Sequence, residues 1–329
     1  MIDYFIIGSN SFSGSFFTNF LLKKNLKIVG VSRSKEKKSL FLPYKASDKK
    51  KNFLFFQVDL NHNLKKIIIL VKKFKPKYIV NFAAQGMVEE SWDNPLDWYR
   101  TNTVSQIQFI EKIKNFKFIK KYIQFSTPEV YGCFKKKMTE NCNYNPSTPY
   151  ANSRACTDSH LINLYKNFKF PVIITRTSNV YGEGQDLYRI IPKTICSALL
   201  NKKMNLHGNG KSIRSFIHMQ DVCEALYKII FLGKIGNIYH ISTNQFISIR
   251  ALCLKILKIL KKNPKKILIK TKDRIGKDMS YKLDSKKIRN NLKWKDKVLL
   301  EEGLKNNIFW CRANLKNFKK KDYLYLHKK

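Results

Sequence analysis

Near the start of the chain, the stretch Tyr4-Phe-Ile-Ile-Gly8-Ser-Asn-Ser-Phe-Ser-Gly14 joins a short apolar run to a turn bounded by glycines. An apolar run followed at once by a turn and a helical segment is typical of the first strand and crossover of a parallel sheet. Such a turn places backbone N–H groups and a helix N-terminus against a pyrophosphate. Glycine is usual at its middle position, and Ser11 leaves the backbone less free there. The stretch predicts a dinucleotide site formed by Gly8, Asn10, Ser11, Phe12, Ser13 and Gly14.

The same alternation of short apolar runs and longer helical segments continues through the first half of the chain. It predicts an α/β fold with a doubly wound parallel sheet. The expected strands are 4–7, 27–31, 53–57, 78–82, 122–125 and 172–175, and a strand over 237–241 is expected to return to the sheet. The expected helices are 16–22, 64–74, 103–113 and 221–232.

The composition of the sequence changes after Tyr181-Gly182. Polar loops follow, and they include a Gly208-Asn-Gly210 turn. A lysine-rich helix from about 247 and a strand over 266–270 follow. These pieces predict a smaller, discontinuous α/β substrate lobe. We expect residues 1–180 and about 216–245 to form the dinucleotide-binding domain, and about 181–215 with 246–329 to form the substrate lobe. Its last stretch, 312–329, is basic and aromatic, and we expect a loosely packed tail.

Charge and composition limit the partners. The chain of 329 residues is 43% hydrophobic, which supports a sizeable core, and Lys+Arg 64 against Asp+Glu 23 gives a net charge of +41. The lysines are spread over the whole length together with many Asn, Ile and Phe, as expected from an AT-rich coding sequence. Solvated faces explain most of them, so nucleic acid is not favoured as a partner. The positive field should attract anionic substrates such as nucleotide diphosphates.

The seven cysteines form an odd, scattered set with no Cys-x-x-Cys pair. This usage predicts reduced thiols and a cytoplasmic location. The chain opens on a strand-like segment, and we expect neither a targeting segment nor a membrane span. No metal-ligand cluster is expected.

Two segments extend the predicted dinucleotide site. In Phe56-Gln-Val-Asp59-Leu60, the carboxylate of Asp59 is expected to meet an adenine amine, with Leu60 beside it. The second strand ends at Ser32-Arg33-Ser34, where there is no carboxylate for the ribose hydroxyls and Arg33 can pair with a 2′-phosphate. These residues favour NADP over NAD. The alternative is that Arg33 stacks on the adenine.

The candidate catalytic residues are concentrated in Ser126-Thr-Pro-Glu-Val-Tyr-Gly132 and Pro149-Tyr-Ala-Asn-Ser-Arg154. Oxidising an alcohol by hydride transfer requires a base, and a tyrosine serves if a neighbouring cation lowers its pKa. Tyr150 and Arg154 are four residues apart, which places them on one face of a helix. By itself such a pair is more often a surface contact. With Thr127 and Glu129 nearby, it predicts an oxidation site.

These motifs, and four others in the same order, resemble the extended short-chain dehydrogenase/reductases that act on nucleotide sugars, above all the dTDP-glucose 4,6-dehydratases. The other four are Asn81-Phe-Ala-Ala-Gln85, Ser178-Asn-Val-Tyr-Gly182, Gly208-Asn-Gly-Lys-Ser-Ile-Arg-Ser-Phe-Ile-His218 and Asp273-Arg-Ile-Gly-Lys-Asp278. The resemblance implies a Rossmann fold, NAD as cofactor in the most similar family, and a nucleotide-diphosphate sugar as substrate. It also implies a homodimer paired through helices and a role in cell-surface polysaccharide biosynthesis.

The resemblance further implies a reaction. Tyr150 takes the sugar O4 proton as hydride leaves C4, with Arg154 beside it and Thr127 holding O4. Glu129 then removes the C5 proton, water leaves from C6, and hydride returns to C6 to give a 4-keto-6-deoxy sugar nucleotide. Ala83 and Ala84 are implied cofactor contacts. The implied substrate contacts are Gln85, Asn179, Arg214 and Arg274.

Three positions depart from the family pattern. Pro128 replaces the aspartic acid that protonates the departing hydroxyl, Arg154 replaces a lysine, and Gly86-Met87 replaces Ser-His. A nucleotide-sugar 4-epimerase or decarboxylase would not need an acid at position 128. A noncatalytic nucleotide-sugar or dinucleotide binder would explain all the departures as drift. Both remain alternatives.

Overall fold

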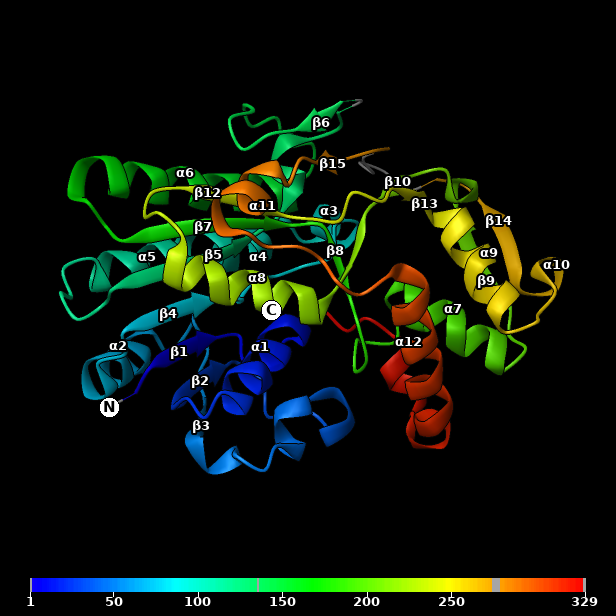
Figure 1. Cartoon of the computed structure of the whole chain (residues 1–329), viewed down its shortest axis with the longest axis horizontal. Coiled ribbons are helices and arrows are strands. Elements are labelled where there is room, and N and C mark those ends of the chain that lie inside the picture. Colours follow the sequence, from blue (N-terminus) through cyan, green and yellow to red (C-terminus); the bar gives the residue numbers. More distant parts are fainter. Residues whose placement is uncertain (1, 135, 274–278, 328–329) are drawn as a thin grey trace.

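The computed structural model describes residues 2–134, 136–273 and 279–327, and its centre is a seven-stranded sheet (Figure 1). The strand order is β12-β7-β5-β4-β1-β2-β3, and every neighbouring pair is parallel. This confirms the doubly wound sheet and the returning strand near 237–241. The strands are β1 (Tyr4–Ile7), β2 (Ile28–Ser32), β3 (Phe53–Gln57), β4 (Tyr78–Asn81), β5 (Lys121–Ser126), β7 (Val172–Thr177) and β12 (Ile238–Ile241).

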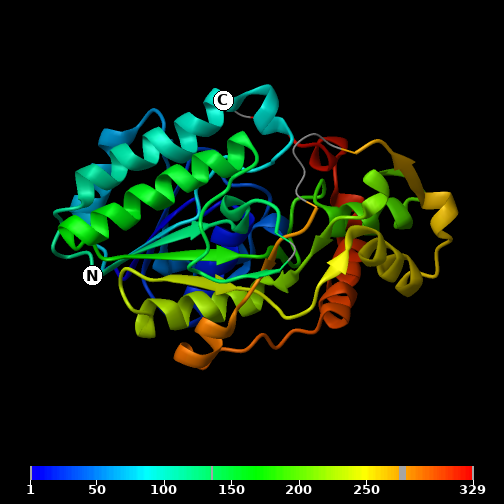
Figure 2. The same ribbon diagram turned by 90° about the horizontal axis from the view of Figure 1, so that it is seen from above.

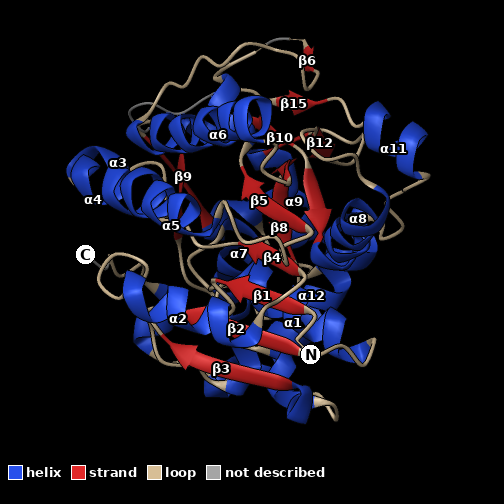
Figure 3. Cartoon of the chain, turned by 90° about the vertical axis from the view of Figure 1, so that its left-hand side faces the viewer, coloured by secondary structure: helices blue, strands red, loops and turns tan. Residues whose placement is uncertain are grey.

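Helices cover both faces of the sheet because its strands are apolar on both sides (Figure 3). One face packs against α1 (Phe12–Lys23), α8 (Met219–Leu232) and α11 (Lys286–Leu292). The other packs against α2 (Leu64–Phe74), α5 (Ser105–Ile113) and α6 (Pro149–Phe168). Each face therefore has its own apolar core.

The chain changes direction in the sheet at β1. This strand pairs with β2 on one side and with β4 on the other, so the connections that follow β1 and β4 diverge. In open α/β sheets, this divergence opens a crevice at the carboxyl ends of the strands, where ligands bind.

A second group of elements, here called the small lobe, lies beside one end of the sheet (Figure 2). It has a separate apolar core that includes Ile195, Leu206, Ile256 and Leu304. Its elements are α7 (Ile190–Leu199), α9 (Ile249–Ile259), α10 (Pro264–Ile267), α12 (Leu300–Asn314), β9 (Met204–His207) and β14 (Leu268–Thr271).

Short elements complete the fold. Three further strand pairs are β8 (Asn179–Tyr181) with β11 (Phe216–His218), β10 (Ile213–Arg214) with β13 (Ile247–Ser248), and β6 (Lys137–Met138) with β15 (Lys282–Leu283). The short helices are α3 (Glu90–Asp93), α4 (Pro95–Tyr99) and η1 to η8, which span Ser39–Phe41, Pro43–Ala46, Lys50–Asn52, Arg100–Val104, Pro128–Tyr131, Gly208–Gly210, Leu315–Asn317 and Lys320–Tyr323. No helix in the described part of the chain has the length and apolar character needed to cross a membrane.

Several predicted boundaries were wrong for local reasons. The helix expected from 16 begins at Phe12, because the Ser11 hydroxyl caps it by accepting from the Gly14 N–H at 3.0 Å. The helix expected over 103–113 begins with a π-helical turn, η4, and α5 starts at Ser105. The strand expected from 266 begins at Leu268, because Asn263 and Pro264 start a turn of helix before it.

The expectation of a loosely packed C-terminal tail was also wrong. Helix α12 extends to Asn314, and the aromatic residues beyond it find partners. The Phe318 ring stacks on Phe41 at 6.2 Å and lies 5.4 Å from Trp310. Aromatic side chains in the tail contribute packing that its basic composition does not suggest.

Candidate functional site

A cleft of about 840 Å³ lies over the carboxyl ends of the central strands and is closed on one side by the small lobe. Residues predicted from separate motifs meet in it: Gly8, Asn10, Ser11, Phe12, Ser13, Arg33, Asp59, Leu60, Ala83, Ala84, Gln85, Thr127, Glu129, Tyr150, Arg154, Asn179 and Arg214. Gly14 does not line the cleft, and Arg274 lies outside the described residues. The crevice predicted by the sheet topology is thus present.

The turn after β1 needs its two glycines for different contacts. Gly8 has φ +83°, and a Cβ there would lie 2.8 Å from the Ala83 nitrogen. A Cβ on Gly14 would lie 2.2 Å from the Gly8 carbonyl oxygen, so Gly14 acts by allowing α1 to pack against the turn. The first turn of α1 presents the N–H groups of Phe12 and Ser13, which have no acceptor within the helix. This N-terminus is suited to a phosphate.

The residues expected at the adenosine end surround the loop after β2. The Asn10 side chain donates to the Ser34 carbonyl at 2.9 Å and so ties the two loops together. Asp59 accepts from the Asn61 N–H at 2.8 Å. Arg33 donates from Nη2 to the Gln85 Oε1 at 2.9 Å. Arg33, an expected cofactor contact, and Gln85, an expected substrate contact, are therefore hydrogen-bonded to each other.

Helix α6 carries the predicted base and its cation. The Thr148 hydroxyl caps the helix by accepting from the Ala151 N–H at 3.1 Å, and Pro149 occupies the first turn. Tyr150 and Arg154 lie on one face, as predicted. Arg154 is only 1% exposed and donates from Nη2 to the Phe125 carbonyl at 2.5 Å.

A buried carboxylate fixes α6 to the sheet. One oxygen of Asp158, Oδ2, accepts from the Ser126 hydroxyl at 2.8 Å and from the Arg176 Nη2 at 3.0 Å. The Arg176 guanidinium lies 4.5 Å from the ring centroids of both Tyr131 and Tyr144. Strands β5 and β7 and helix α6 are therefore joined by the buried ion pair of Asp158 and Arg176, next to Thr127.

Thr127 has two contacts. Its hydroxyl accepts from the Glu129 N–H at 3.3 Å, which caps the short helix η5, and it also hydrogen-bonds with Tyr150. A capping role and an orienting role thus belong to the same side chain. Pro128 lies in the first turn of η5, where its missing N–H is not needed.

The pKa of Tyr150 differs from the sequence prediction. Burial and the Glu129 carboxylate raise it above its ordinary value, and they outweigh Arg154, the Thr127 hydrogen bond and Arg189, which lower it. The predicted effect of Arg154 has the right sign, but the net shift is upward. A phenol whose pKa is raised needs a further positive charge beside it before it can serve as a base near neutral pH.

Arg154 has room for a ligand. Its Nε and Nη1 atoms are buried and have no hydrogen-bond partner among the residues that the structure describes. Buried donors are nearly always paired in proteins, so these two donor nitrogens point to an acceptor supplied by a bound molecule. The ribose hydroxyls of a dinucleotide fit this donor pair, and the turn after β1 fits its phosphates.

The small-lobe side of the cleft holds the expected substrate residues. The Tyr281 hydroxyl donates to the Asn179 Oδ1 at 2.9 Å, and the Arg214 guanidinium lies 4.2 Å from the Tyr281 ring centroid. The sequence did not single out Tyr281 or Arg189. Arg189 is close enough to Tyr150 to lower its pKa, but nothing in its local sequence marks it among 64 basic residues.

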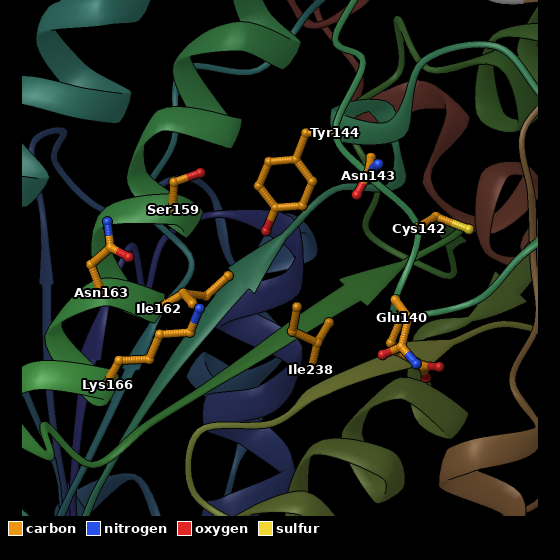
Figure 4. A pocket seen from close by; sticks show the side chains of 10 residues that line it. Glu140, Cys142, Asn143, Tyr144, Ser159, Ile162, Asn163, Lys166 and Ile238 are labelled. Carbon is orange, nitrogen blue, oxygen red and sulfur yellow. The ribbon is translucent and has the colours of Figure 1, made fainter.

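A second, shallower hollow of about 440 Å³ lies between α6 and the start of β12 (Figure 4). Tyr144, Asn163, Lys166 and Ile238 are among its lining residues, and it contains none of the predicted site residues. Within the described ranges, no group of His, Cys, Asp and Glu side chains is arranged to hold a metal ion.

Comparisons with known proteins agree with this geometry. A family profile described as GDP-mannose 4,6 dehydratase matches residues 5–307. The chain is 33% identical over 278 residues to dTDP-D-glucose 4,6-dehydratase from Homo sapiens, a match that covers 82% of this chain and 78% of that protein.

Solved structures extend the likeness. The dTDP-glucose 4,6-dehydratase of Bacillus anthracis in complex with NAD has a TM-score of 0.87 at 28% identity, over 96% of this chain and 98% of that one. The UDP-glucose 4-epimerase of Thermotoga maritima, at 23% identity, shares the fold with a TM-score of 0.86 over 95% of this chain and 100% of that one.

The unpaired donors of Arg154 give a prediction about stability. Arg154→Met should leave the free energy of unfolding within about 1 kcal/mol of the original value, or raise it, because it removes a buried charge with two unpaired donor nitrogens. The same variant should lose the rise in melting temperature that NADH or NADPH gives to the unaltered chain. Urea unfolding and a thermal shift assay measure the two effects.

The matched control is Arg176→Met, which removes an equally buried arginine that is paired with Asp158. It should lower the free energy of unfolding by about 3–5 kcal/mol, because the Asp158 carboxylate is left buried without its cation. A similar loss in Arg154→Met would contradict a ligand-directed role for its N–H groups.

Proposed function

The chain belongs to the family described as GDP-mannose 4,6 dehydratase, and on that premise we propose that it is a nucleotide-sugar 4,6-dehydratase of the dTDP-glucose type. The resemblance to extended short-chain dehydrogenase/reductases is confirmed by the family match and by the relatives. One observation supports the activity above others: Tyr150 is hydrogen-bonded to Thr127, with Glu129 and Arg154 beside it, in the cleft that the phosphate turn also lines.

The roles follow from this arrangement. When bound, NAD(P)⁺ supplies a hydride acceptor and a positive charge. Tyr150 takes the O4 proton of the sugar, and Thr127 orients O4 toward the phenol. Arg154 holds ribose hydroxyls with its two unpaired donors and stabilises the phenolate. Arg189 adds a second cation that lowers the pKa of Tyr150.

Elimination requires both a base and an acid. Oxidation at C4 acidifies the hydrogen on C5, and we assign its removal to Glu129, the carboxylate near Tyr150. The C6 hydroxyl must then leave as water, but Pro128 can donate no proton. We assign both steps to Glu129: it takes the proton from C5 and passes it to the departing oxygen, so that it ends in its starting state. The sugar diphosphate lies along Asn179 and Arg214.

This proposal predicts the behaviour of a Glu129→Gln variant with dTDP-glucose. Mass spectrometry of the unaltered enzyme should show a product lighter by one water. The variant should lose about 10²–10⁴-fold in that rate, because the amide can neither accept the C5 proton nor return it. It should still produce nicotinamide absorbance in a single turnover, since C4 oxidation does not use Glu129.

The control is Glu301→Gln, which alters an exposed glutamate on α12 and should leave the product unchanged. Interconversion of sugar epimers by the unaltered chain, without water loss, would support the 4-epimerase alternative, which needs no acid at position 128. Binding without any turnover would support a noncatalytic binder.

For the cofactor, we propose a preference for NADP. The relative of known structure from Bacillus anthracis is in complex with NAD, so a dinucleotide is well supported, and the choice between the two depends on this chain's own residues. Arg33 lines the cleft directly after β2, where a carboxylate would favour the free ribose hydroxyls of NAD. A guanidinium there favours a 2′-phosphate.

Arg33→Ala should therefore weaken NADPH binding about tenfold or more and change NADH binding by less than about twofold, because only NADPH carries the phosphate. Fluorescence titration of the reduced nicotinamide measures both affinities. Arg312→Ala, which removes an exposed arginine from α12, controls for net charge. An equal loss for both cofactors would assign Arg33 to stacking on the adenine.

We also propose a homodimer that pairs through the helices on the α6 side of the sheet. Apolar side chains there are exposed: Leu96 on α4 is 76% exposed, and Val104, Trp92 and Phe168 are also exposed. Such a group on one face marks an interaction surface.

Light scattering should give twice the 38.7 kDa mass of the chain. Leu96→Glu should halve that mass, because a charge would be buried in the interface. Phe309→Glu, which alters an equally exposed apolar residue on α12, should leave it unchanged. A monomeric unaltered chain would rule out the dimer.

Three further features belong to this proposal. The division into a dinucleotide-binding domain, 1–180 with about 216–245, and a substrate lobe, about 181–215 with 246–329, is supported by the separate apolar core of the small lobe, while α11 within 246–329 packs in the core of the sheet. A cytoplasmic location is supported by seven free cysteines, four of them buried. A role in cell-surface polysaccharide biosynthesis follows from the deoxysugar product.

A further inference from the structure

The end of the chain returns from the small lobe to the sheet. Residues 318–327, here called the C-terminal strap, follow α12 and reach α4, where His327 contacts Trp98 and Asp97. Tyr325 and Leu326 line the same cleft as the phosphate turn and Tyr150. The strap therefore forms part of the wall of the proposed active site.

Contacts at several points hold the strap against the rest of the protein. Near its start, the Lys38 ammonium donates to the Asn317 carbonyl at 3.0 Å and pairs with Asp322 at 3.3 Å. Further along, the Tyr325 ring meets the Tyr188 ring edge-on at 5.5 Å. Burial and Glu90 raise the pKa of the Tyr325 phenol, against the opposite effects of Arg33 and Arg189. Tyr325 thus lies among charged groups of the cleft.

His327 makes the last contacts. Its ring stacks on the buried Trp98 ring at 5.1 Å and 5°. Its Nε2 lies 2.7 Å from Oδ2 of Asp97, and its Nδ1 lies 3.0 Å from Nε2 of Gln85. Gln85 is itself only 3% exposed and is bonded to Arg33.

Hydrogen-bond chemistry fixes the direction of this chain of contacts. A guanidinium can only donate, so Arg33 sets the Gln85 oxygen toward itself and the Gln85 amide nitrogen toward His327. An amide nitrogen can only donate, so His327 Nδ1 must accept. The ring proton then sits on Nε2, where it is donated to Asp97. One order of donation runs from Arg33 through Gln85 and His327 to Asp97.

We propose that His327 is a positioning residue: it fixes the Gln85 carboxamide, and through it the Arg33 guanidinium, in the orientation that recognises the 2′-phosphate of the cofactor. The strap thereby makes cofactor choice depend on the end of the chain. Without His327, the Gln85 amide loses the acceptor at Nδ1, and the Gln85 oxygen that faces Arg33 is held less firmly in its orientation. This inference rests on the proposed NADP preference.

The test measures NADPH and NADH affinities of the full chain by fluorescence titration, which needs no turnover. His327→Ala should weaken NADPH binding about fivefold to tenfold and NADH binding by less than about twofold. His327→Asn, whose oxygen can accept from Gln85 in place of Nδ1, should recover most of the preference. Leu324→Ala, an exposed strap residue, is the matched control and should change neither affinity.

A double-mutant cycle shows whether His327 acts through Gln85. Gln85→Leu should reduce the preference, and adding His327→Ala to it should have no further effect, because the link is already broken. Additive losses would mean that the strap acts in another way and would overturn the inference.

The outcomes separate the two proposals. If the unaltered chain prefers NADPH and His327→Ala keeps that preference, the positioning role is wrong and the cofactor proposal stands. If the unaltered chain shows no preference, both are wrong. An equal loss of NADH and NADPH affinity in His327→Ala assigns the strap a structural role and also overturns the inference.

Discussion

The ion pair between Arg176 and Asp158 determines where the catalytic helix lies, and the site depends on that position. Both side chains are fully buried. The same Asp158 oxygen also accepts from Ser126, the last residue of β5 before Thr127. Burying two charges costs desolvation energy that their attraction only partly offsets, so such a pair is best understood as fixing one arrangement against others. Here it holds α6 to β5 and β7 two turns from Tyr150, so that Tyr150 meets Thr127.

The sheet and its order follow from features that are local in the sequence. The run before Gly8 must be a strand because it is apolar and short, and Ser11 caps the helix that follows. The same holds for Thr148 and Pro149 at the start of α6. One error was also local in kind: Asn263-Pro264 began a helical turn that took the first residues of an expected strand. The tail was misjudged because its partners, Phe41 and Trp98, lie far away in the chain.

The candidate site was harder to predict from the sequence than the sheet. Nearly all of the residues that the motifs singled out line the cleft, because each motif carries its own spacing. They did not give the pKa of Tyr150, since desolvation and the distance to Glu129 depend on packing. They also missed Arg189, Tyr281 and His327, each of which is placed beside a predicted residue only by the fold. In a chain with 64 basic residues, the sequence around one arginine does not indicate a function. Only the fold shows which groups that arginine faces.

Two departures from the family pattern, Arg154 and Gly86, lie in the cleft with Tyr150. Arg154 keeps the positive charge of the family lysine, and its buried guanidinium has two unpaired donor nitrogens that a bound dinucleotide can pair. Gly86, which replaces a serine of the family, lies beside Arg189, and a Cβ there would make an ordinary contact with its Nη2 at 3.6 Å. The site thus holds two cations, Arg154 and Arg189, near a phenol whose pKa burial has raised. Both cations favour ionisation of Tyr150, which an oxidising enzyme needs and a passive binder does not.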